Sequence, residues 1–365
     1  MATIANHPMP KIDHPHDVIF FPTFGRFNES SDSWSVSISG AVVRPGQPNL
    51  PKRIMLRLLR RMMCAPAEAF ESEIFQQRIQ TFAAAALRGK RIEVQLGGRT
   101  HLVSRRSQRN GLFSGEIELS REDVLDLQQS GDLTGQWLTY KLVASQGAAV
   151  GNAPEAEFVG RAQLVGPTGV SVISDIDDTI KHSSVGDRRE LLNNTFLREF
   201  QPIFGMSQLY QHWVEQGATM HYVSSSPWQL YHPLSTFCGD ELFPSGTFHL
   251  RFFRLRDQLT KRIFHARRRG KGKVIHQIVR EFPQRRFVLV GDSGEIDPEI
   301  YSGVTALYPD RIAAIYIREL PDRPLTFQRL AKMRRRMGDT PLQVFQCSSE
   351  LPKSLEEAAV LQAVL

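Results

Sequence analysis

The sequence predicts a protein of mixed α/β class, in which a β-sandwich-like domain precedes an α/β domain. Its 365 residues are enough for two domains of ordinary size. The first half contains short segments in which apolar and polar residues alternate, as in half-buried antiparallel strands. From Val170 onward, continuous apolar runs are separated by helical stretches. This pattern is typical of a buried parallel sheet with helical crossovers.

The composition is that of an ordinary globular protein. Hydrophobic residues make up 41% and charged residues 23%, which excludes global disorder and fibrous architectures. No apolar run is long enough to span a membrane, and the N-terminus lacks the layout of a signal peptide. The three cysteines lie far apart, which argues against a disulfide framework. We therefore expect a cytoplasmic protein that can attach peripherally to membranes.

Four segments are expected along the chain. A flexible N-terminal arm, rich in Pro, His and Asn, is followed by the β-sandwich-like domain, the α/β domain and a C-terminal helical extension. Their predicted ranges are 1–30, 31–168, 169–320 and 321–365. The strands expected in the second segment are residues 36–43, 91–98, 113–120, 137–144 and 157–166.

A helical pattern interrupts these strands at residues 51–87. Apolar residues recur there at helical spacing, among them Ile54, Leu58 and Met62, while arginines lie toward the other face. The arginines are Arg53, Arg57, Arg60 and Arg61. We interpret the pattern as a helix that packs on the sandwich with a solvated basic face. A helix that docks on anionic lipid is the alternative.

Positive charge is concentrated in residues 251–273. The whole chain has a net charge of +7, whereas this segment alone contains ten Lys or Arg and one Asp. The surplus favours contact with an anionic substrate or membrane surface, for which Arg251, Arg254 and Arg256 are candidates. A solubilising helix face is the alternative. No aromatic stacking platform accompanies the charge, so no nucleic-acid partner is expected.

Two carboxylates follow the first apolar run of the predicted α/β domain. Asp175 and Asp177 project to the same side from the end of that strand. An Asp-rich strand end that caps the following helix is one explanation. The other is chemical, because one carboxylate can act as a nucleophile while its neighbour transfers protons. Their like charges then need a hard cation such as Mg²⁺ close by.

Later runs end in residues that complete such a site. Asp292 follows a strand and provides a third carboxylate for the cation, with Glu295 and Asp297 available as further supports. Ser224 ends the intervening run, where it and Ser225 offer hydroxyl and helix N-terminal amide groups to a phosphate.

A positive charge is also needed beside a transferring phosphoryl group. Lys271 is placed to supply it, because it opens the helix expected before the Asp292 strand. Lys273 lies two residues further on and is the rival for this role.

In this order, the motifs resemble the haloacid dehalogenase superfamily of phosphatases. In detail they resemble the catalytic domain of the actin-patch-protein phosphatidate phosphatases, relatives of the lipins, through DIDDTIK, YVSSSPWQLY, LRFF and FVLVGDSGEIDPEIY. The resemblance covers about Gly169 to Arg318, and the preceding region resembles bacterial members more loosely. It implies a Rossmann-like haloacid dehalogenase fold. The gaps from Asp175 to Ser224 and from Ser224 to Lys271 leave no room for a large cap.

The resemblance also implies roles for individual residues. Asp175 corresponds to the nucleophile, and Asp177 to the general acid/base of a reaction through an aspartyl-phosphate. Ser224 and Lys271 match phosphate-binding positions, which Ser225 and Arg251 are expected to assist. The implied Mg²⁺ site consists of Asp175, the backbone carbonyl of Asp177, and Asp292, with Asp297 as outer support.

The expected reaction is Mg²⁺-dependent hydrolysis of phosphatidate to diacylglycerol. An uncapped and therefore open site suits a bulky lipid substrate, although it would also suit a phosphoprotein. A non-catalytic module that senses phosphatidate is a further alternative, but the presence of both Asp175 and Asp177 favours an enzyme. One residue departs from the superfamily pattern, since Asp178 stands where many members have glycine.

Overall fold

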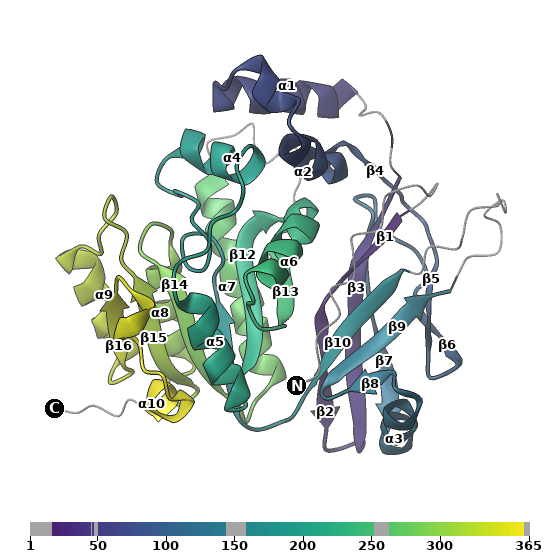
Figure 1. The fold of residues 1–365 in the computed structure, drawn as a ribbon. Coiled ribbons are helices and arrows are strands. Elements are labelled where there is room, and N and C mark those ends of the chain that lie inside the picture. The colour runs from purple at the N-terminus through teal and green to yellow at the C-terminus, as the bar shows by residue number, and fades with distance from the viewer. Residues whose placement is uncertain (1–16, 45, 47–49, 144–157, 252–262, 361–365) are drawn as a thin grey trace. The chain divides into compact units, whose positions relative to one another are not determined.

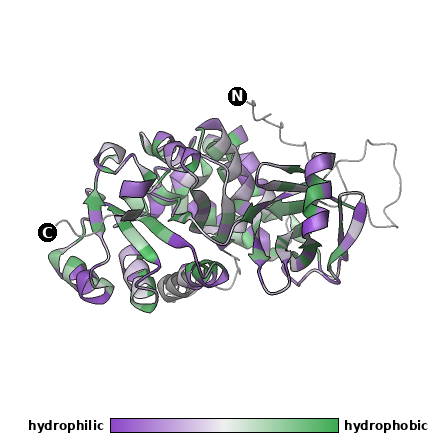
Figure 2. Ribbon diagram, turned by 90° about the horizontal axis from the view of Figure 1, so that it is seen from below, coloured by the Kyte–Doolittle hydropathy of each residue, from purple (hydrophilic) through white to green (hydrophobic). Residues whose placement is uncertain are grey.

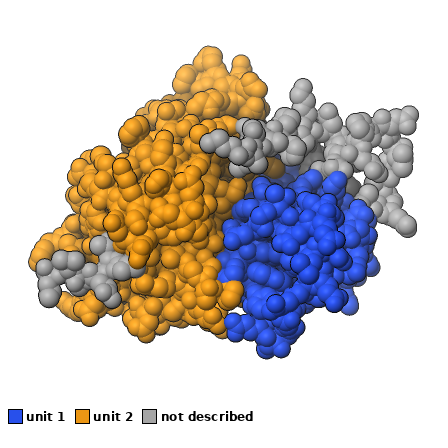
Figure 3. Space-filling view, turned by 60° about the horizontal axis from the view of Figure 1, so that its bottom comes forward, with its two compact units in different colours: residues 1–53, 80–166 blue, residues 54–79, 167–365 orange. Residues whose placement is uncertain are grey.

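The computed structural model describes residues 17–44, 46, 50–143, 158–251 and 263–360. The chain divides into two compact units (Figures 1 and 3). Unit 1 comprises residues 1–53 and 80–166, and unit 2 comprises residues 54–79 and 167–365. Each contains a β-sheet and helices, so the predicted mixed α/β class is confirmed.

Unit 1 is built on a ten-stranded sheet with the main strand order β1-β3-β2-β10-β9-β5-β6. In chain order these strands are β1 (Asp17–Phe21), β2 (Thr23–Asn28), β3 (Ser33–Arg44), β5 (Ile92–Leu96), β6 (Arg99–Ser104), β9 (Trp137–Leu142) and β10 (Val159–Val165). Strands β4 (Ala85–Ala86) and β7 (Leu112–Ser120) pair with β3, and β8 (Leu133–Thr134) pairs with β9. The five predicted strands correspond to β3, β5, β7, β9 and β10.

Among the described strands of unit 1, every neighbouring pair is antiparallel except one. Strands β2 and β10 run parallel, with Ala162 opposite Thr23, so the expectation of a purely antiparallel arrangement is wrong there. Inward-facing residues of the sheet, including Val36, Ile38 and Tyr140, form one buried cluster. Helix α3 (Arg121–Ser130) adds Leu127 to the same cluster.

The predicted N-terminal arm is wrong from Asp17 onward. Strands β1 and β2 occupy most of residues 17–28, and they bury Ile19, Phe20, Phe21 and Phe24. This apolar content offsets the conformational entropy of ordering the segment. Residues 1–16 of the predicted arm lie outside the described residues.

The helical insertion comprises α1 (Leu50–Met63), a 3-10 helix η1 (Ala67–Phe70) and α2 (Glu73–Ala83). Residues 54–79 of this insertion belong to unit 2, so their predicted assignment to the same domain as the strands of unit 1 is wrong. The side chain of Arg78 shows the reason, because it donates a hydrogen bond of 2.9 Å to the carbonyl of Thr195. Its guanidinium also lies 3.8 Å from the centre of the Phe200 ring.

Unit 2 contains a six-stranded sheet in the order β13-β12-β11-β14-β15-β16, and every neighbouring pair is parallel. In chain order the strands are β11 (Val170–Ser174), β12 (Thr219–Pro227), β13 (Thr247–Arg251), β14 (Arg286–Asp292), β15 (Ile312–Arg318) and β16 (Leu342–Phe345). The chain builds outward from β11 in one direction and then, at β14, in the other. In open sheets of this kind, ligands bind at the carboxyl edge beside that reversal.

Helices cover both faces of this sheet, which is why β14 and β15 are buried along almost their whole length (Figure 1). They are α4 (Arg188–Phe196), α5 (Met206–Glu215), α6 (Tyr231–Asp240), α7 (Ile263–Glu281), α8 (Asp297–Leu307), α9 (Phe327–Met337) and α10 (Leu355–Val360), with short 3-10 helices η2 (Trp228–Leu230) and η4 (Ser348–Glu350). The helices mix hydrophobic and hydrophilic residues, as expected of elements with one buried side (Figure 2). Within the described residues, no helix is both long and apolar enough to cross a membrane.

The C-terminal segment is more than the predicted helical extension. It supplies α9 and α10 but also β16, which pairs with β15 as the sixth strand of the sheet. Phe345 of β16 is buried, and this burial explains why a strand as short as LQVF is retained at the edge of the sheet.

Candidate active site

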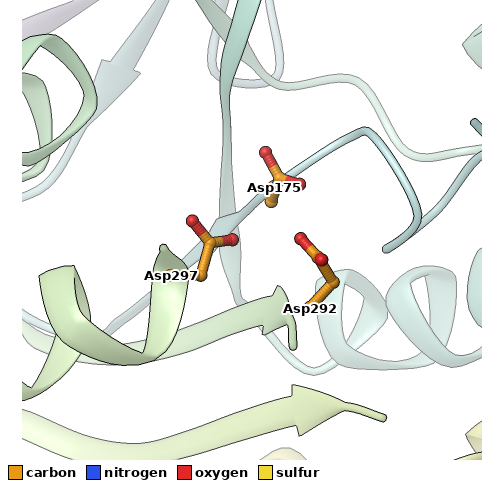
Figure 4. Close-up of side chains that lie close together, drawn as sticks. All are labelled: Asp175, Asp292 and Asp297. Atoms are coloured by element: carbon orange, nitrogen blue, oxygen red, sulfur yellow. The ribbon is translucent and has the colours of Figure 1, made fainter. Parts of the chain in front are cut away.

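Three carboxylates meet at the carboxyl edge of the unit 2 sheet (Figure 4). Asp175 follows β11, Asp292 is the last residue of β14, and Asp297 is the first residue of α8. Because β11 and β14 are neighbouring parallel strands, their carboxyl ends lie side by side. One oxygen of each carboxylate lies within 4.8 Å of the others, and all three residues are buried. Oxygen ligands in such a cluster suit a hard divalent cation.

Two oxygen atoms of the cluster lack a hydrogen-bond partner among the described residues. They are Oδ2 of Asp175 and Oδ2 of Asp292, and both are buried. In contrast, Oδ1 of Asp292 accepts hydrogen bonds from the amides of Gly294 (2.6 Å) and Glu295 (2.9 Å). An unpaired carboxylate oxygen is costly to bury, and a bound cation removes that cost. The residues present therefore fit a divalent cation held between Asp175 and Asp292.

The pKa values of two carboxylates in the cluster also favour a bound cation. Burial raises the pKa of Asp175 well above its usual value, and the nearby carboxylates add to this although Lys271 opposes it. Burial also raises the pKa of Asp292, again with contributions from Asp297 and Glu295. A cation at the unpaired oxygens would favour the ionised form of Asp175 and Asp292 and so lower these raised pKa values.

Lys271 connects two of the carboxylates. Its Nζ lies 2.6 Å from Oδ1 of Asp175 and 2.5 Å from Oδ1 of Asp297. Burial lowers the pKa of this lysine, but the two carboxylates outweigh burial and raise it overall, so the ammonium group stays charged. Lys271 lies inside α7 rather than at its start, where the sequence placed it. Lys273 is exposed, and of the two lysines it is Lys271 that reaches the carboxylates.

Asp177 is surrounded by donors of its own. Its Oδ1 accepts from Lys181 (3.0 Å) and from the hydroxyl of Ser183 (2.7 Å). Its Oδ2 accepts from the hydroxyls of Ser226 (2.7 Å) and Ser224 (3.1 Å). Burial alone would raise the pKa of Asp177, but Lys181 and the hydroxyl groups outweigh it and hold the pKa below its usual value. Asp177 is thus an ionised carboxylate at neutral pH.

The predicted phosphate-binding residues lie at different places along the sheet edge. Ser224 is buried and contacts Asp177. The hydroxyl of Ser225 instead lies 3.4 Å from a carboxylate oxygen of Glu295. Arg251 is the last residue of β13, which is separated from β11 by β12.

Two expectations about this region need correction or lie outside the structure. No helix begins directly after Ser224, because β12 continues to Pro227 and α6 begins only at Tyr231. The amides that follow Ser224 are therefore not at a helix N-terminus. Of the basic segment at residues 251–273, residues 252–262 lie outside the described residues, and Arg254 and Arg256 are among them.

Asp178 organises the loop beside Asp177. Its backbone has a φ of 55°, in the left-handed region that favours glycine. The carboxylate offsets this strain by accepting hydrogen bonds from the amides of Ser183 (2.7 Å), Ser184 (3.0 Å) and Val185 (2.7 Å). The aspartate that departs from the superfamily pattern therefore holds the loop that carries Ser183 to Asp177.

Gly291 is required by the close approach of α8. A Cβ atom at this position would lie 2.4 Å from Oδ2 of Asp297 and 2.8 Å from the hydroxyl of Tyr301. Both distances are shorter than van der Waals contact allows. The glycine before Asp292 thus makes room for the third carboxylate of the cluster.

Some supporting residues were not identified from the sequence. Lys181 is one, although it stands in the DIDDTIK motif, because its charge alone does not distinguish a buried lysine from a surface lysine. Arg329 of α9 is another, and it donates to the carbonyls of Ser293 (2.7 Å) and Glu295 (2.9 Å) in the loop after Asp292. Nothing in the local sequence around Arg329 signals this contact.

Fold and site together define an α/β protein with a buried cluster of carboxylates and lysine at the carboxyl edge of a parallel sheet. Residues 170–319 match the family model described as the catalytic domain of phosphatidate phosphatase APP1. The resemblance inferred from the motifs is thereby confirmed for this segment.

Two curated relatives each match part of the chain. Phosphatidate phosphatase APP1 of Saccharomyces cerevisiae is 39% identical over 169 residues, which are 43% of this chain and 27% of the relative. An uncharacterized protein of Schizosaccharomyces pombe is 32% identical over 167 residues, 45% of this chain and 27% of the relative. The chain thus spans only 27% of the length of each of these curated relatives.

Proposed function

We propose that the chain is a Mg²⁺-dependent phosphoric monoester hydrolase that converts phosphatidate to diacylglycerol and phosphate. The observation that carries the proposal is the buried cluster of Asp175, Asp292, Asp297 and Lys271. It lies inside the segment that matches the phosphatidate phosphatase catalytic domain. The name of the yeast relative supports phosphatidate as the substrate.

The proposed fold of unit 2 is that of a haloacid dehalogenase-like phosphatase without a large cap, and that of unit 1 is a β-sandwich-like domain. The strand order of unit 2 supports the first assignment, since β11 lies in the middle of a parallel sheet. Between Asp175 and Ser224, the only helices are α4 and α5, and this stretch is fully described. A site without a cap would admit a substrate that is still held in a bilayer.

Asp175 and Asp292 would hold Mg²⁺ through their unpaired Oδ2 atoms, together with the backbone carbonyl of Asp177, and Asp297 would support the site from outside. When bound, the ion would neutralise negative charge on the carboxylates and on the phosphoryl group. Lys271 would contribute a second positive charge, because its ammonium group already contacts Asp175.

In the first step, Oδ of Asp175 attacks phosphorus while the bond from phosphorus to the glycerol oxygen breaks. Asp177 gives a proton to that departing oxygen, so diacylglycerol leaves and an aspartyl-phosphate remains. Asp177 must first take up a proton. The arrival of a negatively charged phosphoryl group beside Ser224 would favour this, because a nearby like charge raises the pKa of a carboxyl group.

In the second step, Asp177 removes a proton from water, and the resulting hydroxide attacks phosphorus. The bond from phosphorus to Asp175 breaks, which releases phosphate and restores the carboxylate. The contacts of Asp177 with Lys181 and Ser226 then favour release of this proton to solvent, which returns Asp177 to its ionised form. We place this reaction in the cytoplasm at an anionic membrane surface.

A phosphate-release assay tests the proposal. The full chain is incubated with phosphatidate in detergent micelles, with Mg²⁺ or with EDTA, beside a panel of phosphopeptides. We expect release from phosphatidate with Mg²⁺ and none with EDTA. Release from phosphopeptides but not from phosphatidate would replace the lipid substrate by a phosphoprotein.

A further inference from the structure

Helix α1 carries an exposed row of aliphatic side chains. Leu50, Ile54 and Leu58 are 70%, 50% and 42% exposed. They are spaced four residues apart and therefore lie on the same side of the helix, one turn above the other. We call these three residues the apolar row. Large aliphatic side chains are rarely exposed in such a continuous line on a solvated helix.

An arginine row runs beside the apolar row. Arg53, Arg57 and Arg61 have the same four-residue spacing, and all three are exposed. Each arginine is adjacent in sequence to, or three residues from, a member of the apolar row, so the two rows are neighbours on the helix surface. The sequence of α1, LPKRIMLRLLRRMM, is strongly basic, with four arginines and one lysine.

The C-terminal part of α1, from Ile54 onward, belongs to unit 2. Met63 at its C-terminal end is fully buried. Nε of Arg189 donates to the carbonyl of Met63 (3.1 Å), and Nη2 of the same residue donates to the carbonyl of Cys64 (3.3 Å). Arg60 also lies 5.3 Å from the centre of the Phe70 ring. The apolar row is thus exposed on a helix whose end is fixed.

Helix α3 shows what an ordinary solvated helix of this chain is like. It also exposes a leucine, Leu125, at 56%. This leucine is isolated, and Glu122, Asp123 and Asp126 lie around it in the sequence. A single exposed leucine among acidic residues needs no partner. An apolar row beside arginines, in contrast, matches the acyl-chain region and the negatively charged headgroup region of one leaflet of an anionic bilayer.

We propose that α1 docks on an anionic lipid bilayer, with the apolar row inserted among the acyl chains. The arginine row would then contact the headgroup phosphates. The charge of the arginine row selects a negatively charged surface, and the narrow apolar row suits shallow insertion. Three aliphatic side chains are too few for the roughly 800 Å² per partner that a stable protein interface buries.

The docking helix is connected to the candidate active site. From α1 the chain continues into α2, where Arg78 lies over the Phe200 ring. Lys181 lies 4.7 Å from the centre of the same ring and 3.0 Å from Asp177. The inference rests on the proposed function only in that the substrate is a lipid. Docking itself requires no catalysis.

Flotation of the full chain with vesicles tests the inference. The vesicles contain phosphatidylcholine alone or with phosphatidylglycerol, an anionic lipid that is not a phosphomonoester. We expect binding to the anionic vesicles only, weakened by salt. The double substitution Ile54→Gln and Leu58→Gln should weaken it roughly tenfold or more, because it removes the inserted side chains. Leu125→Gln is the matched control and should bind as the unchanged chain does.

Unchanged vesicle binding by the double variant would overturn the inference. So would a change in its oligomeric state without a change in vesicle binding, since α1 would then contact a second copy of the chain. Thermal unfolding checks that the variant is folded. The ratio of its rate on phosphatidate vesicles to its rate on a water-soluble phosphomonoester should fall.

These readouts separate the inference from the proposed function. If the unchanged chain binds anionic vesicles through α1 but releases no phosphate from phosphatidate, the proposed function fails and the docking inference stands. If the unchanged chain hydrolyses phosphatidate while the double variant binds vesicles normally, the docking inference fails and the proposed function stands.

Discussion

Single residues of the DIDDTIK motif do more than supply carboxylates for chemistry. Asp178 holds three amides of the following loop, and Lys181 holds the carboxylate of Asp177. Both residues are buried, and both act on the position or charge of groups beside the reaction. We therefore expect substitutions at these two positions to have different signatures, one in stability and one in pH dependence.

Asp178→Ala should lower the free energy of unfolding by about 2–4 kcal/mol, since each of three hydrogen bonds contributes about 1 kcal/mol and the strained backbone remains. Urea denaturation measures the change. Asp240→Ala, at an exposed position at the end of α6, is the control and should stay within about 0.5 kcal/mol. An equal effect of the two substitutions would contradict the role assigned to Asp178.

Where breakdown of the aspartyl-phosphate limits the rate, Lys181→Met should move the acidic limb of the pH–rate profile to higher pH, because that step needs ionised Asp177. The lysine holds the pKa of Asp177 below its usual value, and without it burial would raise that pKa. Hydrolysis of a water-soluble phosphomonoester as a function of pH measures the shift. Lys181→Arg, which keeps the charge, should shift the limb less. An acidic limb that is the same in all three proteins would show that Lys181 does not set the ionisation of Asp177.

Two arginines join elements of unit 2 that lie far apart in the sequence. Helix α2 is joined to the end of α4 by Arg78, which donates to the carbonyls of Thr195 and Arg198. Arg329 of α9 holds the loop after β14 in a similar way. In both cases a charged side chain from a distant part of the sequence satisfies backbone carbonyls near the site.

Arg78→Ala should lower the free energy of unfolding of unit 2 by roughly 3 kcal/mol, because it removes charged hydrogen bonds at a buried position. Burial lowers the pKa of this arginine to about 10, so it remains charged at neutral pH. Chemical denaturation measures the loss. Arg88→Ala, at an exposed position of unit 1, should have little effect, and similar losses in both variants would refute the α2–α4 contact.

A histidine pair between β12 and β13 should make stability depend on pH. Burial lowers the pKa of His221 and lowers that of His249 to about 4, and both side chains contact the hydroxyl of Thr247 at 2.8 Å. The unfolded chain binds these protons near pH 6.5, whereas the folded chain binds them only at lower pH. Stability is therefore complete above about pH 6.5 and falls as the pH drops toward 4, by at most about 1.4 kcal/mol per unit for each histidine.

The substitution His249→Gln isolates one member of this pair. The free energy of unfolding, measured by urea denaturation at several pH values, should fall less steeply between neutral pH and pH 4 than in the unchanged chain. His212→Gln on the exposed side of α5 is the control. Equal slopes in the unchanged chain and in His249→Gln would mean that His249 is protonated in the folded state as well.

At the scale of the whole molecule, the division of the chain could be predicted only in part. The strands of both units follow from alternation and from apolar runs, and Asp175 and Asp292 follow from their positions at strand ends. What residues 54–79 pack against could not be predicted, because periodicity shows which side of a helix is apolar but not which surface receives it. Lys181 and Arg329 were not identified from the sequence for a related reason, since their roles depend on partners that only the fold brings near.

The central claim is that the cluster around Asp175 in unit 2 hydrolyses a phosphomonoester. The most direct test is phosphate release from phosphatidate by the full chain and by Asp175→Asn, with Asp240→Asn as the matched exposed control. We expect activity to fall by roughly 10³-fold or more in Asp175→Asn and to be unchanged in the control, with the same thermal midpoint or a higher one in Asp175→Asn. Activity retained by a folded Asp175→Asn protein would contradict the account.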